Sequence, residues 1–138
     1  MPSPPVSRIW APALTAGAGL AAVGAVALRN PHVPGSWGTC VFLSATGFYC
    51  PGCGGLRAVH DLVHGHPVQA LQSNALGLAL CALLGVIWLG WFVGRWRDRP
   101  VTWDRWFTPA AAWTLVGVMV LFSVLRNTPW GVWLAPAA

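Results

Sequence analysis

The sequence predicts an all-α membrane protein with three transmembrane helices and one or two short interfacial helices. Hydrophobic residues make up 56% of the 138 residues and charged residues only 8%, whereas about a quarter of an ordinary soluble domain is charged. Three apolar stretches have about the 20 residues that cross a bilayer core. Tryptophans gather near their ends, as in the aromatic belts of membrane proteins. We expect a single membrane domain over residues 1–138.

The charged residues predict lipid rather than nucleic acid as the surroundings. Eight arginines and three acidic residues give a formal net charge of +5. The arginines stand at the ends of apolar segments and form no basic stripe with interleaved aromatic residues, which is the pattern of a nucleic-acid surface. We therefore expect a lipid bilayer, other membrane proteins or a second copy of the chain as partners, and no nucleic acid.

Three segments are predicted to span the membrane, at residues 9–28, 75–93 and 106–125. The first contains no charge, and at about 1.5 Å per residue it reaches about 30 Å. The second follows a helix that enters the membrane near Asn74. It carries small residues at four-residue spacing, which permits close helix packing, so Cys81 is interpreted as a packing residue.

The arginines also predict an orientation. With three spans, the N-terminus and the charged turn at residues 95–105 lie on one side of the membrane. Counting arginines gives five on that side and three on the other. The positive-inside rule then places the turn in the cytoplasm and residues 40–74 on the extracytoplasmic side.

Residues 40–74 hold three of the four cysteines and three of the four histidines. The apolar piece Val41 to Tyr49 is too short to cross a bilayer, so we place it at the interface or as a re-entrant segment. Gly54 to His64 is predicted to form one short helix. Gly65 is expected to end that helix, and Pro67 to be the first residue of the next one.

Three chemistries fit Cys40, Cys50 and Cys53. The Cys-Pro-Gly-Cys turn brings two sulfurs together, and the dipole of the following helix is expected to favour the thiolate of Cys53. A structural disulfide from Cys40 to Cys50 or Cys53 is the leading interpretation. Zinc is a second, with His32, His60 or a partner supplying the fourth ligand of a closed site. Thiol–disulfide exchange, with Cys40 as the resolving thiol, is the third.

The histidines of the short helix are less informative. His60 stands about 10 Å along the helix from Cys53, which weighs against it as a ligand to the same ion. His60 and His64 are four residues apart and share one helix face, where they could bind a different ion. Two interfacial histidines with a polar edge towards water are the favoured interpretation.

No catalytic signature accompanies the cysteines. The sequence has no glycine-rich phosphate loop, no paired carboxylates and no His-Glu-x-x-His motif. We therefore predict no catalytic residue and no cofactor, with zinc the one ion that the cysteines would suit. A non-enzymatic accessory or assembly protein is the favoured function. A membrane thiol–disulfide oxidoreductase or metal-binding protein that uses the three cysteines is the alternative.

The stretch TGFYCPGCGGLRAVHDLVHGHPVQALQSNALG carries a specific cluster of motif residues. With Cys40 upstream, it resembles a bacterial family of small membrane proteins, domain of unknown function 2752, over roughly Cys40 to Leu84. The sequence departs from the family pattern at Val41, Leu56 and Ala75, where the family has proline, threonine and proline.

The resemblance implies a location in the inner or plasma membrane of a bacterium. It also implies that the cysteine–arginine turn is the functional face, and it brings no assigned reaction. Together with the chemistry above, it gives the following set of expected site residues: Cys40, Cys50, Pro51, Cys53, Gly54, Arg57, His60 and Asn74.

Overall fold

The computed structural model of the chain describes residues 5–99 and 107–135. Within these residues the protein is helical and contains no strand, so the expected all-α fold is confirmed. The elements are α1 (Pro5–Leu28), α2 (Val41–Thr46), α3 (Gly55–Val63), α4 (Pro67–Trp96), α5 (Pro109–Arg126) and the 3₁₀ helix η1 (Pro129–Leu134).

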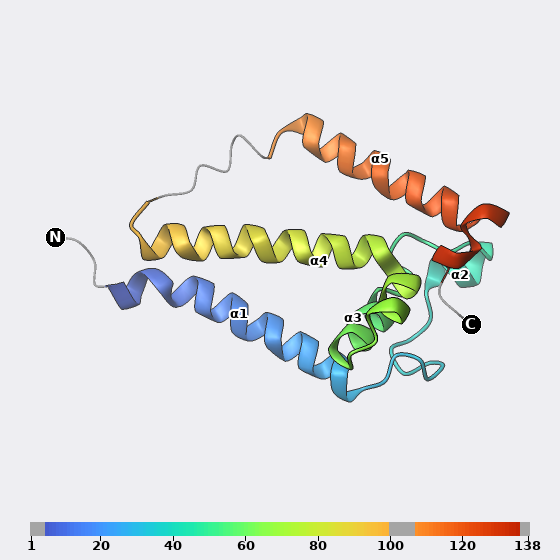
Figure 1. Cartoon of the computed structure of the whole chain (residues 1–138), viewed down its shortest axis with the longest axis horizontal. Helices are drawn as coiled ribbons and strands as arrows, with labels where there is room; N and C mark the ends of the chain where they lie inside the picture. Colours follow the sequence, from blue (N-terminus) through green and yellow to red (C-terminus); the bar gives the residue numbers. More distant parts are fainter. Residues whose placement is uncertain (1–4, 100–106, 136–138) are drawn as a thin grey trace.

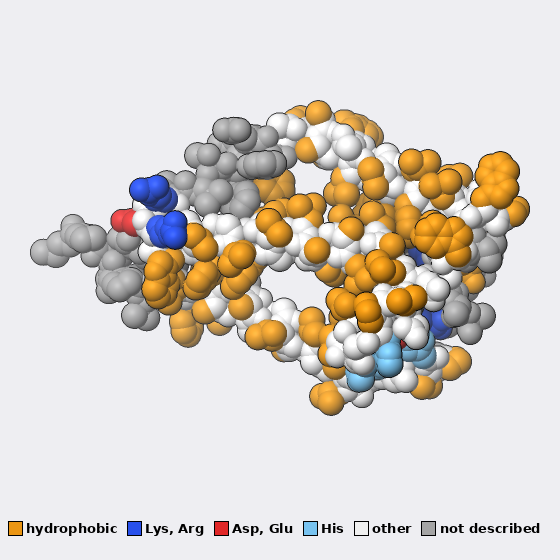
Figure 2. Space-filling view, in the orientation of Figure 1, with side chains coloured by type: hydrophobic (Ala, Val, Ile, Leu, Met, Phe, Trp, Pro, Cys, Tyr) orange, Lys and Arg blue, Asp and Glu red, His pale blue; other side chains and the backbone are white. Residues whose placement is uncertain are grey.

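Helices α1, α4 and α5 are long and apolar enough to cross a membrane. Large apolar side chains stand exposed along all three, among them Leu20 of α1, Val86 of α4 and Trp113 of α5. Figure 2 shows hydrophobic side chains spread over the shafts of these helices. A protein surrounded by water rarely exposes so much contiguous apolar surface, whereas lipid tails accept it. The expected three transmembrane helices are therefore confirmed as candidate spans.

The short helices gather at one end of the long ones (Figure 1). Helices α1 and α5 finish at this end and α4 begins there, so α2, α3 and η1 lie together around three helix termini. We call this region, residues 29–66 and 127–135, the short-helix end. The opposite end carries the charged residues that follow α4, Arg97, Asp98 and Arg99.

Local sequence signals explain where α3 stops and α4 starts. Gly65 adopts a φ of +80°, a left-handed conformation that glycine tolerates best. The N–H of His66 donates to the carbonyl of Asp61 at 2.8 Å, and the N–H of Gly65 to that of Leu62 at 3.2 Å. These two bonds form a Schellman motif, which ends the helix. Pro67 then begins α4, so both expected positions are confirmed.

Helix α4 bends at Asn74, whose backbone (φ −166°, ψ 88°) is not helical. The expected second span, residues 75–93, therefore begins directly after the bend, while the helix itself runs from Pro67 to Trp96. The expected start of the third span, Trp106, lies outside the described residues. Helix α5 begins at Pro109, where the Thr108 side chain accepts a hydrogen bond from the N–H of Ala111.

The buried core lies mainly where the short-helix end meets α4 and α5, and it is unusually polar. Ala58 and Ala70 are fully buried where α3 packs against α4. Beside them lie four buried polar or charged residues, which a core of this size accepts only when they are hydrogen-bonded: Asp61, Ser73, Asn74 and Arg126.

The small-residue face of α4 is open in the described part of the chain. Cys81 is exposed, and a Cβ added at Gly85 would meet no atom within 4 Å. Among the described residues nothing packs closely on Cys81 or Gly85, so the interpretation of Cys81 as a packing residue stays a prediction for contacts with another chain.

Candidate functional site

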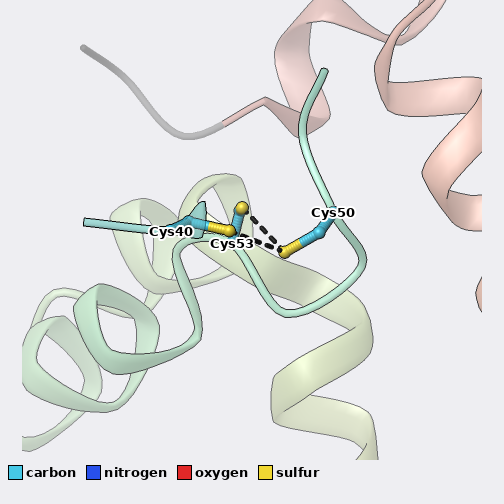
Figure 3. A group of neighbouring side chains, drawn as sticks. All are labelled: Cys40, Cys50 and Cys53. Carbon is cyan, nitrogen blue, oxygen red and sulfur yellow. Dashed lines mark hydrogen bonds between the residues drawn. The ribbon is translucent and has the colours of Figure 1, made fainter. Parts of the chain in front are cut away.

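The three cysteines of the short-helix end converge on one point (Figure 3). Cys40 immediately precedes α2, and Cys50 and Cys53 flank the tight turn before α3. The Sγ atoms of Cys50 and Cys53 are 2.8 Å apart and those of Cys40 and Cys50 are 3.6 Å apart. All three Sγ atoms lie within 4.8 Å of one another. We call these residues the thiol cluster.

The backbone of the Cys-Pro-Gly-Cys turn explains how two sulfurs meet. The N–H of Cys53 donates to the carbonyl of Cys50 at 3.1 Å, which closes the turn. Gly54 then takes a φ of +81° as the residue that caps α3. A side chain would be strained in this left-handed conformation, so glycine at this position lets the chain leave the turn directly into the helix.

The thiol cluster has a geometry between that of a disulfide and that of a metal site. A disulfide needs a sulfur–sulfur distance of about 2.0 Å, whereas Zn–S bonds of about 2.3 Å put two tetrahedral thiolates about 3.8 Å apart. The Cys40–Cys50 distance of 3.6 Å fits the metal value, and the Cys50–Cys53 distance of 2.8 Å lies between the two. All four cysteines carry free thiols, and the expected disulfide stays a prediction.

The pKa values of Cys40 and Cys53 are shifted in opposite directions. Backbone N–H donation from Leu43, followed by S–H donation from Cys53 and Cys50, lowers the pKa of Cys40. Burial, followed by hydrogen bonding to Cys50 and Cys40, raises the pKa of Cys53 to about 12. The expectation that Cys53 favours thiolate is therefore wrong. Its side chain is buried among the other sulfurs, and the loss of solvation outweighs the helix dipole.

Arg126, the last residue of α5, and Asn127, which follows it, hold the segment that carries the cysteines. Nη1 of Arg126 donates to the carbonyls of Cys50 and Cys53, both at 3.0 Å. Asn127 and the backbone of Tyr49 exchange two hydrogen bonds of 2.8 Å each. Arg126 is only 1% exposed, so its positive charge is buried next to the thiol cluster.

Asn74 holds the same turn from the side of α4. Its Nδ2 donates to the carbonyls of Pro51 and Cys53 at 2.9 and 3.1 Å, while its Oδ1 accepts the N–H of Gly77 at 2.7 Å. A Cβ at Gly77 would come within 3.1 Å of the Asn74 side chain. Asn74 is fully buried, so the bend of α4 is organised around the cysteine turn.

A pocket of about 630 Å³ adjoins the thiol cluster. The cysteines, Gly54 and Arg57 line it, together with aromatic residues such as Trp37 and Tyr49. Nε of Arg57 donates to the carbonyl of Pro31 at 3.3 Å. This volume falls in the range of small-molecule sites, and all three cysteines of the cluster line it.

His60 does not belong to this site. Its imidazole lies with His32 and Asp61 in a separate group of potential ligands, which we call the imidazole cluster. No histidine of the described residues joins the three cysteines in a common ligand group. Neither His32 nor His60 therefore supplies the fourth ligand that the sequence suggested for a zinc site.

Seven of the eight site residues expected from the sequence lie at or beside the thiol cluster, and the eighth, His60, does not. Sequence reasoning did not identify Arg126, Asn127 or Asp61 as site residues. Arg126 closes an apolar stretch like any charged residue at a helix end, and 76 positions separate it from Cys50. The available signal was the pair Arg126-Asn127 directly after the third span, because either side chain can donate hydrogen bonds back to backbone carbonyls.

A comparison with protein families agrees with the motif. The family described as Protein of unknown function (DUF2752) matches residues 40–88, which include the thiol cluster, α3 and most of α4. No curated protein and no solved structure matches the chain. The resemblance that the motif indicated is therefore confirmed, because residues 40–88 match the model of that family of unknown function.

Proposed function

We propose that this protein is a non-enzymatic accessory membrane protein that binds a thiophilic metal ion, best matched by Zn²⁺, through Cys40, Cys50 and Cys53. One observation carries the proposal: three sulfurs from three points of the backbone converge within 4.8 Å at the short-helix end. Thiolate sulfur selects Zn²⁺ and Cu⁺ over Mg²⁺ and Ca²⁺, which prefer oxygen ligands.

The number of ligands favours an exchangeable ion over a structural one. Closed structural zinc sites have four protein ligands, whereas sites with three keep a position for water or a substrate. The adjoining pocket of about 630 Å³ lies where the missing ligand would enter. A partner protein or a small thiol would supply that ligand, which suits an accessory protein that receives or delivers the ion.

The buried charge of Arg126 supports the same proposal. A Zn²⁺ ion with three thiolates has a net charge of −1, and an isolated buried charge is strongly unfavourable. The guanidinium of Arg126 contacts the carbonyls of two of the three cysteines. It would neutralise the occupied site without contacting the ion.

Metal analysis of the purified protein tests the proposal. The full-length protein, extracted in mild detergent, is expected to retain about one equivalent of Zn²⁺ at this site. Cys50→Ser should lose that equivalent. Cys81→Ser is the matched control, because it makes the same chemical change on α4 outside the cluster. Equal metal contents of the two variants would overturn the proposal.

Thiol–disulfide exchange is a second candidate, favoured by the Cys50–Cys53 distance of 2.8 Å. The dithiol would give two electrons and two protons to the disulfide of a partner protein, forming one S–S bond while the partner's bond breaks. It predicts that the number of free thiols in intact cells changes with added reductant. A constant number, together with bound metal, would exclude exchange.

We also propose that the short-helix end faces away from the cytoplasm of a bacterial cell. The positive-inside count of five arginines against three supports this orientation. A membrane-impermeant maleimide added to intact cells is then expected to label Cys40. Labelling only after the cells are opened would reverse the orientation without affecting the metal proposal.

A further inference from the structure

A second group of ligand atoms lies at the other end of α3. His60 and Asp61 come from the last turns of that helix, and His32 comes from the loop after α1. Nε2 of His32 lies 2.7 Å from Oδ1 of Asp61, and Nδ1 of His60 lies 3.8 Å from the same oxygen. One nitrogen from each imidazole and a carboxylate oxygen of Asp61 all lie within 4.8 Å of one another.

The Asp61 carboxylate is held in a fixed orientation. Its side chain is 8% exposed, and its Oδ2 accepts a hydrogen bond from the hydroxyl of Ser73 at 3.1 Å. Oδ1 is thereby directed at the two histidines. Metal-binding carboxylates are commonly fixed by a second hydrogen bond of this kind.

His60 has a ring nitrogen that the protein leaves unused. Its Nδ1 is buried and has no hydrogen-bond partner, which is a costly arrangement for a polar atom. The ring is stacked on His64, with centroids 4.1 Å apart.

The spacing of the three ligand atoms is close to that of a metal site with nitrogen and oxygen ligands. Bonds of about 2.1 Å put neighbouring ligands about 3.0 to 3.4 Å apart in octahedral or tetrahedral geometry. The two observed distances, 2.7 and 3.8 Å, lie on either side of that range. An ion between the three atoms would also satisfy Nδ1 of His60. The side chain of His32 is 42% exposed, so water can reach the remaining coordination positions.

We propose that His32, His60 and Asp61 form a second metal site, which binds a divalent transition-metal ion through two imidazoles and one carboxylate. This ligand set suits Zn²⁺, Ni²⁺ and Fe²⁺ and has open positions. The site differs in chemistry from the thiol cluster and shares no ligand with it.

Metal titration in the absence of the thiols tests this site alone. A Cys40→Ser, Cys50→Ser, Cys53→Ser variant in detergent is titrated with Ni²⁺ alone, which prefers imidazole to carbonyl or water. It should bind about one equivalent. Adding His60→Gln should abolish that binding. His32→Gln should abolish it too, and because His32 is half-exposed, this second variant distinguishes loss of a ligand from loss of the fold. Ser73→Ala should weaken binding about 10-fold, because it frees the carboxylate without removing a ligand.

His66→Gln is the matched control, because His66 is exposed and its side chain makes no capping hydrogen bond. It should leave the Ni²⁺ affinity unchanged. If the thiol-free protein binds no Ni²⁺, or binds it equally after both His60→Gln and His32→Gln, the second site does not exist. If the thiol-free variant keeps as much Zn²⁺ as the wild type, the thiol proposal fails while this one stands.

Discussion

The two clusters at the ends of α3 are built in opposite ways. In the thiol cluster, Arg126 and Asn74 bind the backbone carbonyls of the turn and leave the sulfurs to one another. In the imidazole cluster the side chains hold each other directly, through the contact of His32 with Asp61. The first site is therefore shaped by residues that are not ligands, whereas the second is shaped by a contact between two of its own ligands, with Ser73 as the one supporting donor described above. Substitutions outside the ligands should affect the first more than the second.

Thiol alkylation should reveal the largest difference. With its pKa raised to about 12, Cys53 has about 1,000-fold less thiolate near neutral pH than an ordinary cysteine. Cys40, whose pKa is lowered, should react first. Mass spectrometry of the folded, metal-free protein after brief treatment with limiting iodoacetamide measures this order.

The denatured protein is the control, because all four cysteines should then react at similar rates. Equal rates for Cys40 and Cys53 in the folded protein would contradict the burial of Cys53, and with it the described geometry of the turn.

Replacement of Arg126 should have the next largest effect. Arg126→Met removes a charged donor from the carbonyls of Cys50, Cys53 and Leu134. The Cys50 carbonyl keeps the N–H of Cys53 and the Cys53 carbonyl keeps Nδ2 of Asn74. Hydrogen bonds to charged groups contribute about 1.5 to 3 kcal/mol each, and removal of the buried charge offsets part of their loss, so the net loss should be about 3 kcal/mol. Thermal unfolding in detergent measures this loss, and Zn²⁺ binding by the thiol cluster should weaken with it.

Arg97→Met is the control for that experiment, since Arg97 is exposed at the opposite end of α4. Ni²⁺ binding by the imidazole cluster should survive in Arg126→Met at temperatures where the variant is folded. Loss of both sites in parallel would show that the two clusters are not built independently.

The pH dependence of metal binding should show the smallest but most specific difference. The Cys53 thiol keeps its proton up to a pKa of about 12, so binding must displace that proton together with any proton that the other two thiols still hold. Affinity should therefore rise by about tenfold or more per pH unit between about pH 7 and pH 9. The pKa of His60 is lowered, so its imidazole is already neutral in that range and contributes no slope. Titrations of each cluster with the other removed compare the two slopes.

Sequence reasoning succeeded where a signal is local. The uncharged run of α1 gave its candidate span Ile9–Leu28, because length and composition decide whether a helix crosses a bilayer. Gly65 and Pro67 marked the junction of α3 and α4 because each has a specific backbone preference. The convergence of Cys50 and Cys53 followed in the same way from the turn between them.

The contacts that complete both clusters could not be predicted from spacing. His32 meets Asp61 across 29 positions and Arg126 meets Cys50 across 76, and no periodicity links residues so far apart. The expectation for Cys53 was wrong for a related reason. Its protonation depends on how deeply neighbouring segments bury it, which local sequence does not specify.

The bend of α4 joins the two clusters mechanically. Ser73 donates its hydroxyl to Asp61 and offers its carbonyl to Arg126, while the next residue, Asn74, holds the carbonyl of Cys53. Two consecutive residues thus connect both clusters to the bend at the start of the apolar part of α4. A displacement of either cluster would act on this bend, so a change at the short-helix end would be transmitted to the membrane-spanning part of α4 through one short segment.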